Sequence, residues 1–483
     1  MNFGMIFKTL GIVLLVEAAC MLPSAAVSLI YNQADFSAFL MTILVLLVSG
    51  LALYSIRTKN SNIYSRDGFA IVSIGWILVS FFGALPFYIS GSIPAFIDAF
   101  FETVSGFTTT GSTILREIES LPRGILFWRS FTHWMGGMGV LVLTLAVLPK
   151  AKANTLHIMK AESPGPNPEK LVPRIGQSAK ILYSVYIVLT AIQIVMLIIA
   201  GMPVYDSFIH TFGTAGTGGF SNMNKSVGAY GNVYAEVIIT VFMFLFGVNF
   251  TLYYQSLKGN FKSIWKDEEF RFYAGTVLLS IALITWDLFG KVFGSVWEGL
   301  RHASFQVSSI ITTTGYSTID FNLWPVFSKT ILVILMFIGA SAGSTGGGIK
   351  CIRFVVLFKT IKREIMKVIH PRSVYTVKIG GKNLDEGAMS AVLTYFFTYI
   401  AIFVGALLIV ALDGMDMVTT FTSVATTIGN VGPGFEMVGP MGSFADFSVL
   451  SKLVFSLCML FGRLEIFPML ILFTPSFWKK VNI

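Results

Sequence analysis

The amino-acid sequence predicts an all-α polytopic membrane protein: four pseudo-symmetric helix–pore-loop–helix units around a central pore, preceded by an extra N-terminal transmembrane hairpin. Three observations predict this fold. First, 54% of the 483 residues are hydrophobic and 12% are charged, about half the charged share of a typical soluble domain. Second, a short apolar segment that ends in a glycine turn recurs along the chain. Third, Lys and Arg gather in the connections that such a fold leaves in the cytoplasm.

The repeated segment is clearest at residues 101–113, which read FETVSGFTTTGST, and at residues 305–318, which read FQVSSIITTTGYST. Both copies are apolar, but each is shorter than the roughly 20 residues that a membrane-spanning helix needs. We therefore expect half-helices that enter the membrane and turn back at the glycine. A third copy begins at Phe208, ten residues before Gly218, and a weaker fourth copy ends across residues 426–434.

The chain begins with two apolar segments, residues 6–30 and 36–54, which predict the transmembrane hairpin within residues 1–60. The run after Lys8 also resembles a secretory signal peptide. It continues towards Ile30, however, and therefore suits a first membrane helix better.

Each later unit is expected to hold a spanning segment, a half-helix with its glycine turn, and a second spanning segment. We expect the four units at residues 61–150, 151–262, 263–370 and 371–483. The predicted segments are 68–89, 95–113 and 125–148 in unit one; 179–200, 205–221 and 233–257 in unit two; 272–289, 297–318 and 324–360 in unit three; 388–412, 417–434 and 447–477 in unit four. Glycine-interrupted apolar segments that repeat in this way are typical of pores and transporters.

The basic residues predict the orientation in the membrane. They cluster within residues 150–180, 258–271, 350–382 and 479–480. Because positive charge collects on the cytoplasmic side, we expect both termini in the cytoplasm and all four half-helices to enter from outside. The net charge of +9 is thus a sign of topology and does not predict nucleic-acid binding. Contact with anionic lipid or with an acidic cytoplasmic partner is a second use for these residues.

Four glycine turns that converge on one axis suit a cation. A cation that leaves water needs oxygens to replace its hydration shell, and backbone carbonyls supply them. Glycine allows backbone torsions that are closed to other residues, and the C-terminal end of each half-helix carries partial negative charge. Irregular backbone at membrane depth is tolerated only where it lines a cavity. The competing interpretation, Gly/Thr packing motifs between helices, fits a single copy better than four.

Residues 339–348 read GASAGSTGGG and interrupt the second helix of unit three, with Lys350 and Arg353 after them. Each glycine costs a helix about 1 kcal/mol relative to Ala, so we expect the helix to unwind here. A flexible loop just below the carbonyls of the glycine turns, which would form the selectivity filter, would close the pore. A purely structural kink is the alternative. A phosphate-binding loop fits poorly, because the spacing misses G-x-x-x-x-G-K-[ST] and no strand precedes it.

Arg463 lies in an otherwise apolar run that is broken only by the sequence GRLE at 462–465. A cation within the membrane is a functional candidate by default. If it faces the pore beneath the filter, Arg463 would repel the permeating ion and limit the flux. Alternatively, it pairs with Glu465 or caps the carbonyls of the unwound loop, and the two roles are compatible.

Other classes of protein fit the sequence less well. The three Cys lack the spacing of a disulfide framework or zinc motif. The five His are dispersed, and a membrane enzyme acting on lipid would need clustered His or carboxylates, so the sequence does not predict an enzyme. Four similar units around one axis also favour a pore over a two-lobed alternating-access transporter.

Several motifs carry a likeness to a known family. They are the four glycine turns, HWMGGMG at 133–139, GSTGGGIK at 343–350 and GRLE at 462–465. Together they resemble the Trk/Ktr/HKT superfamily of potassium and related cation transporters over nearly the whole chain. The N-terminal hairpin, SPGP at 163–166 and NVGPG at 430–434 are most similar to the bacterial TrkH branch of that superfamily.

The resemblance implies that each unit contributes one filter glycine. By position these are Gly111, Gly218, Gly315 and Gly432, with Gly429 as the alternative in unit four. The neighbouring filter residues would be Thr109, Thr110, Thr217, Thr314, Asn430 and Val431. Members with Ser at the first glycine position favour sodium, whereas members with four glycines favour potassium. The resemblance therefore implies potassium ions in the filter and potassium uptake; a pore that passes sodium, or both ions, is the alternative.

The resemblance also implies a gate and partners. The gate would consist of Gly339, Gly343, Ser344, Thr345, Gly346, Gly347, Gly348 and Lys350, together with Arg463. The family implies a homodimer with one pore in each protomer, docked on a cytoplasmic TrkA-like ring. That ring binds the regulatory nucleotide, ATP/ADP or NAD, so no nucleotide site is expected in this chain. The implied location is the bacterial cytoplasmic (inner) membrane, in contact with lipid.

Overall fold

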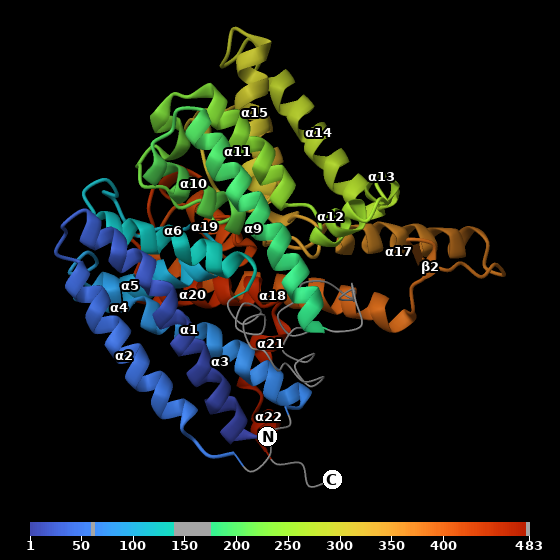
Figure 1. Ribbon diagram of the computed structural model, residues 1–483. Helices are drawn as coiled ribbons and strands as arrows, with labels where there is room; N and C mark the ends of the chain where they lie inside the picture. Colours follow the sequence, from blue (N-terminus) through green and yellow to red (C-terminus); the bar gives the residue numbers. More distant parts are fainter. Residues whose placement is uncertain (59–62, 140–174, 480–483) are drawn as a thin grey trace.

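The computed structural model describes the backbone of residues 1–58, 63–139 and 175–479. Its regular structure is almost entirely helical (Figure 1); β1 (Lys378–Ile379) and β2 (Lys382–Asn383) form a small antiparallel pair. Within the described ranges, six helices are long and apolar enough to cross a membrane, or seven if one bent pair counts as a span. The predicted all-α polytopic fold is therefore confirmed.

The N-terminal hairpin consists of α1 (Phe3–Ile30) and α2 (Phe36–Tyr54), drawn in blue in Figure 1. Small residues bring the two helices together: a Cβ on Gly11 would lie 2.7 Å from the carbonyl oxygen of Gly50. Such close approach is typical of helix pairs in membranes. Because α1 also packs against two helices of the next unit, the hairpin is joined to the body of the protein.

The four units follow in chain order. Unit one contains α3 (Ser65–Gly83), α4 (Leu85–Ile89), α5 (Phe96–Phe107) and α6 (Arg123–Gly137). Unit two contains α9 (Ile175–Ile199), α10 (Val204–Gly216), η2 (Ser226–Tyr230), α11 (Val233–Phe246), α12 (Phe250–Leu257) and α13 (Lys262–Lys266). Unit three contains α14 (Glu268–Leu288), α15 (Val296–Ile311), η3 (Phe321–Leu323), α16 (Val326–Phe337) and α17 (Cys351–Ile369). Unit four contains α18 (Glu386–Val410), η4 (Ala411–Asp413), α19 (Met417–Gly429), η5 (Glu436–Val438), α20 (Val449–Arg463), α21 (Phe467–Leu470), η6 (Ile471–Phe473) and α22 (Pro475–Trp478).

The predicted half-helices are α5, α10, α15 and α19, and each is followed by a glycine turn. They contain 12, 13, 16 and 13 residues, fewer than a membrane-spanning helix needs. The prediction of one short helix in each unit is therefore confirmed.

The second helix of unit two differs from the prediction of one span over 233–257. Helices α11 and α12 meet at 90°, because the chain breaks at Gly247–Asn249. The side chain of Asn249 accepts a hydrogen bond from the Thr251 backbone N–H at 2.9 Å and so begins a new helix as its N-cap. An N-cap residue inside an apolar run was the sequence signal for this break.

The second helix of unit four is also broken, whereas the sequence predicts one span over 447–477. Helix α20 ends at Arg463, and Glu465 and Ile466 then adopt positive φ angles of 59° and 66°. Pro468 stands at the start of α21, a position that suits proline. In unit one, α6 ends at Gly137, and residues 140–148 of the predicted span lie outside the described part of the chain. The motif at 163–166 and most of the basic cluster at 150–180 lie outside it as well.

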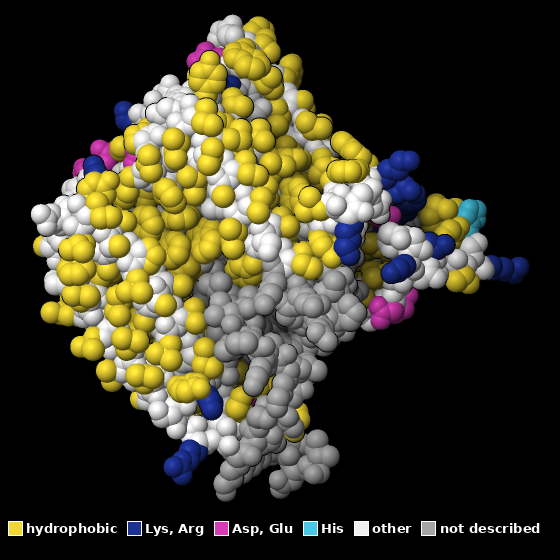
Figure 2. Space-filling view, viewed as in Figure 1, with side chains coloured by type: hydrophobic (Ala, Val, Ile, Leu, Met, Phe, Trp, Pro, Cys, Tyr) yellow, Lys and Arg dark blue, Asp and Glu magenta, His cyan; other side chains and the backbone are white. Residues whose placement is uncertain are grey.

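The surface separates into apolar and basic parts. Large apolar side chains are exposed along the spanning helices, for example Leu44, Leu278 and Phe397, as expected of surfaces that face lipid. In Figure 2, Lys and Arg gather on the projecting part that carries α17 and the β1–β2 pair. Lys362 and Lys367 on α17 are both exposed. A long basic extension thus leaves the apolar body of the protein.

Candidate functional site

The four glycine turns have the same backbone conformation. Each begins with a residue in the left-handed region, with φ between 54° and 59°: Thr109, Thr217, Thr313 and Asn430. Each contains, two residues later, a glycine with φ between 77° and 101°: Gly111, Gly219, Gly315 and Gly432. Positive φ is an outlier for a β-branched residue such as Thr, and strained backbone concentrates at functional sites. The repeated strain in three of the four turns therefore indicates a site.

Hydrogen bonds fix the register of the four turns. The residue between the left-handed residue and the glycine donates its backbone N–H to a carbonyl five residues earlier, at 2.8–2.9 Å. These pairs are Thr110 to Ser105, Gly218 to Gly213, Thr314 to Ser309 and Val431 to Thr426. They close each half-helix in the manner of a Schellman motif, so the four glycines occupy equivalent positions.

This register places a different glycine from the predicted one at the equivalent position of unit two. In unit two the glycine equivalent to Gly111 is Gly219, and the predicted Gly218 occupies the preceding position. Counting from Phe208 fails because the residue equivalent to Phe101 is Ile209, one place later along α10. In unit four, Gly432 has the expected position, whereas the alternative, Gly429, is the last residue of α19.

The four turns contact one another in a closed ring. A Cβ on Gly111 would lie 1.9 Å from the carbonyl oxygen of Gly218 in the next unit. A Cβ on Gly219 would lie 1.9 Å from the oxygen of Thr314, one on Gly315 would lie 2.5 Å from that of Val431, and one on Gly432 would lie 2.8 Å from that of Thr110. Each glycine therefore gives room to the equivalent carbonyl of the next unit, and unit four returns to unit one.

A pocket of about 60 Å³ lies at this ring and is lined by all four glycines, Gly111, Gly219, Gly315 and Gly432. Ser112 and Ser221, which follow the first two glycines along the chain, also line it. The sequence-predicted glycine turns are thus brought together at one cavity, as a pore requires.

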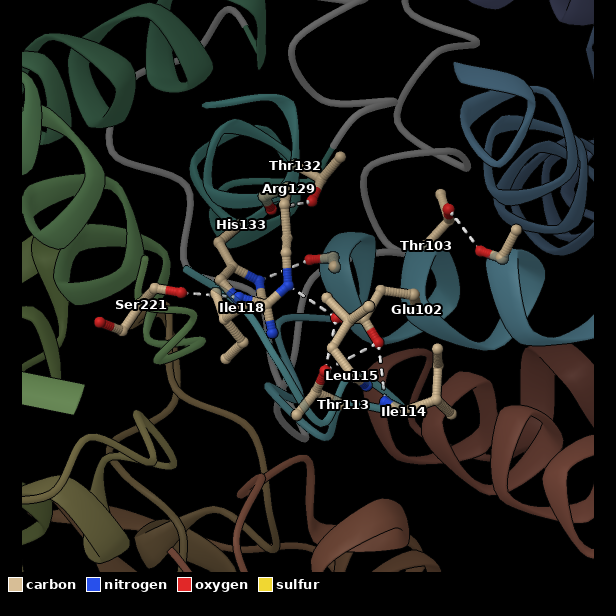
Figure 3. A network of polar contacts seen from close by, with 12 residues as sticks. Glu102, Thr103, Thr113, Ile114, Leu115, Ile118, Arg129, Thr132, His133 and Ser221 are labelled. Carbon is tan, nitrogen blue, oxygen red and sulfur yellow. Dashed lines mark hydrogen bonds and ion pairs between the residues drawn. The ribbon is translucent and has the colours of Figure 1, made fainter. Parts of the chain in front are cut away.

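Three charged or titratable side chains lie behind the first two turns (Figure 3). Glu102 of α5 and Arg129 of α6 form a buried ion pair at 2.6 Å. The Nδ1 atom of His133 lies 2.7 Å from the Gly106 carbonyl oxygen, and the His133 ring lies 4.1 Å from that of Phe220. The sequence analysis did not single out Glu102 or Arg129, although charged residues inside apolar runs are the signal that finds such sites.

The unwound segment between α16 and α17 confirms the predicted break in unit three, and it lies against the break in unit two. The Ser341 N–H donates to the Gly247 carbonyl at 3.1 Å, and the Thr345 hydroxyl donates to the Phe246 carbonyl at 3.2 Å. In return, the Phe250 N–H donates to the Gly343 carbonyl at 3.0 Å. The bend between α11 and α12 therefore frees backbone groups that hold the loop.

The loop also contacts the glycine turns. The Gly347 N–H donates to the Thr313 hydroxyl at 2.6 Å. A Cβ on Gly347 would lie 2.8 Å from the Cβ of Asn430, and one on Gly346 would lie 3.1 Å from the Thr312 carbonyl oxygen. The loop is thus packed directly against the turns of units three and four.

Both ends of the loop are fastened to the surrounding structure. One oxygen of Glu269, on α14, accepts the backbone N–H groups of Ala342 at 2.7 Å and Ile352 at 2.9 Å. The buried Lys350 ammonium donates to the Gly346 carbonyl, and the Ser344 hydroxyl donates to the Ser341 carbonyl at 2.6 Å. Gly343 and Gly348 have positive φ angles of 72° and 67°, and Gly339 donates its N–H to the Ile349 carbonyl at 2.9 Å.

Arg463 joins the loop to two other units. Its guanidinium donates to the Thr345 carbonyl at 2.8 Å and to the Gly137 carbonyl, at the end of α6, at 2.7 Å. Glu465 instead forms an ion pair with Arg353, which follows the loop. The structure shows the predicted contact of Arg463 with a loop carbonyl, whereas Glu465 pairs with Arg353. The role of Arg463 in limiting the ion flux stays a prediction.

A comparison with known proteins identifies the family. Residues 34–480 match the family model of TrkH, described as cation transport proteins. The chain belongs to the TrkH family. Among TrkH relatives, it is 39% identical to the Trk system potassium uptake protein TrkH of Salmonella typhimurium and 38% identical to that of Escherichia coli K12. Each alignment covers 99% of this chain and all of the relative.

A solved TrkH structure has the same fold. The crystal structure of the potassium transporter TrkH from Vibrio parahaemolyticus superposes with a TM-score of 0.89 at 36% identity. The match covers 99% of this chain and all of that chain. Over nearly its whole length, the chain thus has the fold of that TrkH structure.

Proposed function

We propose that this protein takes up potassium across the cytoplasmic membrane through a channel-like pore. The observation that carries the proposal is the closed ring of equivalent glycine turns, in which each glycine meets a backbone carbonyl of the next unit. Rings of backbone carbonyls replace the hydration shell of a monovalent cation. The relatives named as Trk system potassium uptake proteins support potassium as the ion.

The filter in this proposal consists of Gly111, Gly219, Gly315 and Gly432 with the residues that precede them in each turn. All four units supply glycine, the pattern that favours potassium over sodium in this superfamily. Potassium is the transported ion and is held only transiently.

The gate in this proposal is the loop at 339–348 with Lys350 and Arg463. The loop packs against the filter turns and is held by backbone bonds to α11 and α12, so its release would open the path below the filter. The broken inner helices support this role, because a continuous helix could not unfold locally at so small a cost.

The proposed assembly is a homodimer in the bacterial inner membrane, with both termini in the cytoplasm, bound to a cytoplasmic TrkA-like nucleotide-binding ring. The basic extension of α17 supports it, since a cluster of Lys and Arg suits the cytoplasmic side and an acidic partner or lipid surface. The "Trk system" in the relatives' names also indicates several components.

Ion flux into liposomes containing the purified full-length protein tests the proposal, with potassium, rubidium, sodium and lithium compared under the same gradient. We expect potassium and rubidium to enter well above sodium. Equal sodium entry would contradict the filter assignment and favour a non-selective pore of the same fold. Because a closed gate would suppress all four ions, the same panel is run on a variant with residues 339–348 shortened, which we expect to raise the flux.

A further inference from the structure

The Glu102–Arg129 ion pair lies where α5 and α6 of unit one meet the filter. Both side chains are almost completely buried, with 0% and 2% of their surface exposed, and Arg129 Nε lies 2.6 Å from Glu102 Oε1. Burying two charges costs several kcal/mol each unless further hydrogen bonds satisfy them. The partners that satisfy these two charges are therefore informative.

The carboxylate of Glu102 binds the irregular segment that follows the first filter turn (Figure 3). It accepts the Thr113 hydroxyl at 2.8 Å and the Ile114 backbone N–H at 3.0 Å. Thr113 stands two residues after Gly111. Glu102 therefore fixes the first turn immediately beyond its filter glycine.

The guanidinium of Arg129 binds the corresponding irregular segment that follows the second turn. Its Nη1 donates to the Ser221 carbonyl at 2.9 Å, and its Cζ lies 3.5 Å from the centre of the Phe220 ring. Ser221 stands two residues after Gly219, so the ion pair joins the same register position of two neighbouring turns. Arginine can do this because its planar fork offers several donors in fixed directions, whereas a lysine ammonium is a single point charge.

Two hydrogen bonds between other pairs of neighbouring turns involve neutral groups only. The Tyr316 hydroxyl of unit three donates to the Phe220 carbonyl at 3.1 Å, and the Ser112 hydroxyl of unit one donates to the Gly432 carbonyl at 3.1 Å. Hydrogen bonds that involve a charged group are about twice as strong as neutral ones. The ion pair therefore fixes the distance between turns one and two more rigidly than these neutral hydrogen bonds fix the distances between the other turns.

We propose that Glu102 and Arg129 are positioning residues that set the discrimination between potassium and sodium, by fixing the distance between the first two filter turns. This inference rests on the proposed function, because it takes the four turns as the filter. A filter whose turns can approach one another accommodates the smaller sodium ion better. Weakening the Glu102–Arg129 ion pair should therefore let more sodium through.

The same pair has an electrostatic effect that an experiment can separate from positioning. Arg129 lines the pocket at the filter, so Glu102→Gln leaves an uncompensated cation beside the pore, whereas Arg129→Lys keeps the positive charge and changes only the geometry of the pair. A purely electrostatic role therefore lowers the cation flux in Glu102→Gln, leaves it unchanged in Arg129→Lys, and leaves the ratio of sodium to potassium unchanged in both. A positioning role raises that ratio in both.

The test measures potassium and sodium flux in liposomes for full-length Glu102→Gln and Arg129→Lys, each of which nearly preserves side-chain size. We expect the ratio of sodium to potassium flux to rise about tenfold in both, the change that loss of one charge-assisted hydrogen bond produces. The matched control is Asp98→Asn, which breaks the ion pair between Asp98 and Lys452 at 2.7 Å. Asp98 lies in the first turn of the same half-helix, α5, at the opposite end from the glycine turn, so we expect the ratio of sodium to potassium flux in this variant to stay within about twofold of the wild type.

Ratios within twofold of the wild type in both Glu102→Gln and Arg129→Lys would overturn the proposal. A lower flux in Glu102→Gln alone, at a constant ratio of sodium to potassium in both variants, would also overturn it and assign the pair an electrostatic role. If both variants fail to fold while Asp98→Asn folds, by size-exclusion chromatography, the pair is structural and the proposal is wrong. Failure of the proposed function is distinct, because then the wild-type protein itself would not prefer potassium.

Discussion

The glycine turns and the breaks in the inner helices each draw on all four units, but they are built in opposite ways. The four turns share one backbone conformation and one closing hydrogen bond. The inner helices differ: α6 ends at Gly137, α11 and α12 bend by 90°, residues 338–350 unwind between α16 and α17, and α20 ends at Arg463.

This difference fits the filter and the gate that we propose. A ring of equivalent carbonyls needs equal geometry from every unit, so the turns stay alike even where the sequences differ. A gate needs one movable segment and neighbouring groups that hold it in place. One unit therefore supplies the loop, and the other units supply carbonyls, N–H groups and Arg463. Changes in the outer layer should therefore alter selectivity, and changes in the inner layer should alter flux.

The largest expected effect is in the outer layer, at Gly219. A Cβ there would lie 1.9 Å from the Thr314 carbonyl oxygen, and the residue has a φ of +77°. Gly219→Ala must therefore push two turns apart. We expect potassium flux in liposomes to fall about 100-fold, since overpacking costs about 3 kcal/mol.

Gly231→Ala is the matched control for this substitution. Gly231 also has a positive φ, +56°, but nothing lies within 4 Å of its would-be Cβ. We expect this variant to lose about 1 kcal/mol of stability and to keep its selectivity. Normal flux in a folded Gly219→Ala protein would show that the ring does not need a glycine in unit two, and would return the assignment to Gly218.

A smaller effect is expected in the inner layer, at Arg463. Arg463→Ala removes the bonds to the Thr345 and Gly137 carbonyls, which tie the loop to α6. We expect potassium flux to rise about tenfold because hydrogen bonds from a charged donor contribute about 1.5–3 kcal/mol, while the ratio of sodium to potassium stays the same. Arg116→Ala is the control: its ion pair with Asp446 is exposed, and exposed pairs contribute little. Unchanged flux in folded Arg463→Ala would remove this residue from the gate.

Much of this arrangement could be predicted from the sequence. The half-helices were evident because their apolar runs are too short to span the membrane, and the break in unit three because five glycines fall within 339–348. The breaks in units two and four were not predicted. Their signals, Asn249 and Pro468, are single residues inside apolar runs. The helix ends at those points only because Phe246, Gly247 and Glu465 find partners in or beside the loop.

Two features of the site depended on contacts that the sequence does not display. The choice between Gly218 and Gly219 is set by the hydrogen bond from Gly218 to the Gly213 carbonyl, and a count of residues along the chain misses it by one. Glu102 and Arg129 lie 27 residues apart on different helices, and their shared position behind two turns appears only in three dimensions. Local patterns thus predict elements, whereas register and pairing follow from packing between units.

The smallest expected effect would test whether the bend in unit two holds the gate. Asn249→Ala removes the N-cap of α12, which costs about 1 kcal/mol, and a would-be Cβ on Gly343 of the loop lies 2.9 Å from the Asn249 side chain. We expect the thermal midpoint to fall and potassium flux to rise about fivefold without a change in selectivity. Asn232→Ala is the control, because Asn232 caps the other end of the same bent pair, accepting from Tyr234 and Ala235. It should cost similar stability and leave the flux unchanged. Equal flux in the two variants would mean that α12 supports the fold alone, and that the loop is held by unit four and Glu269.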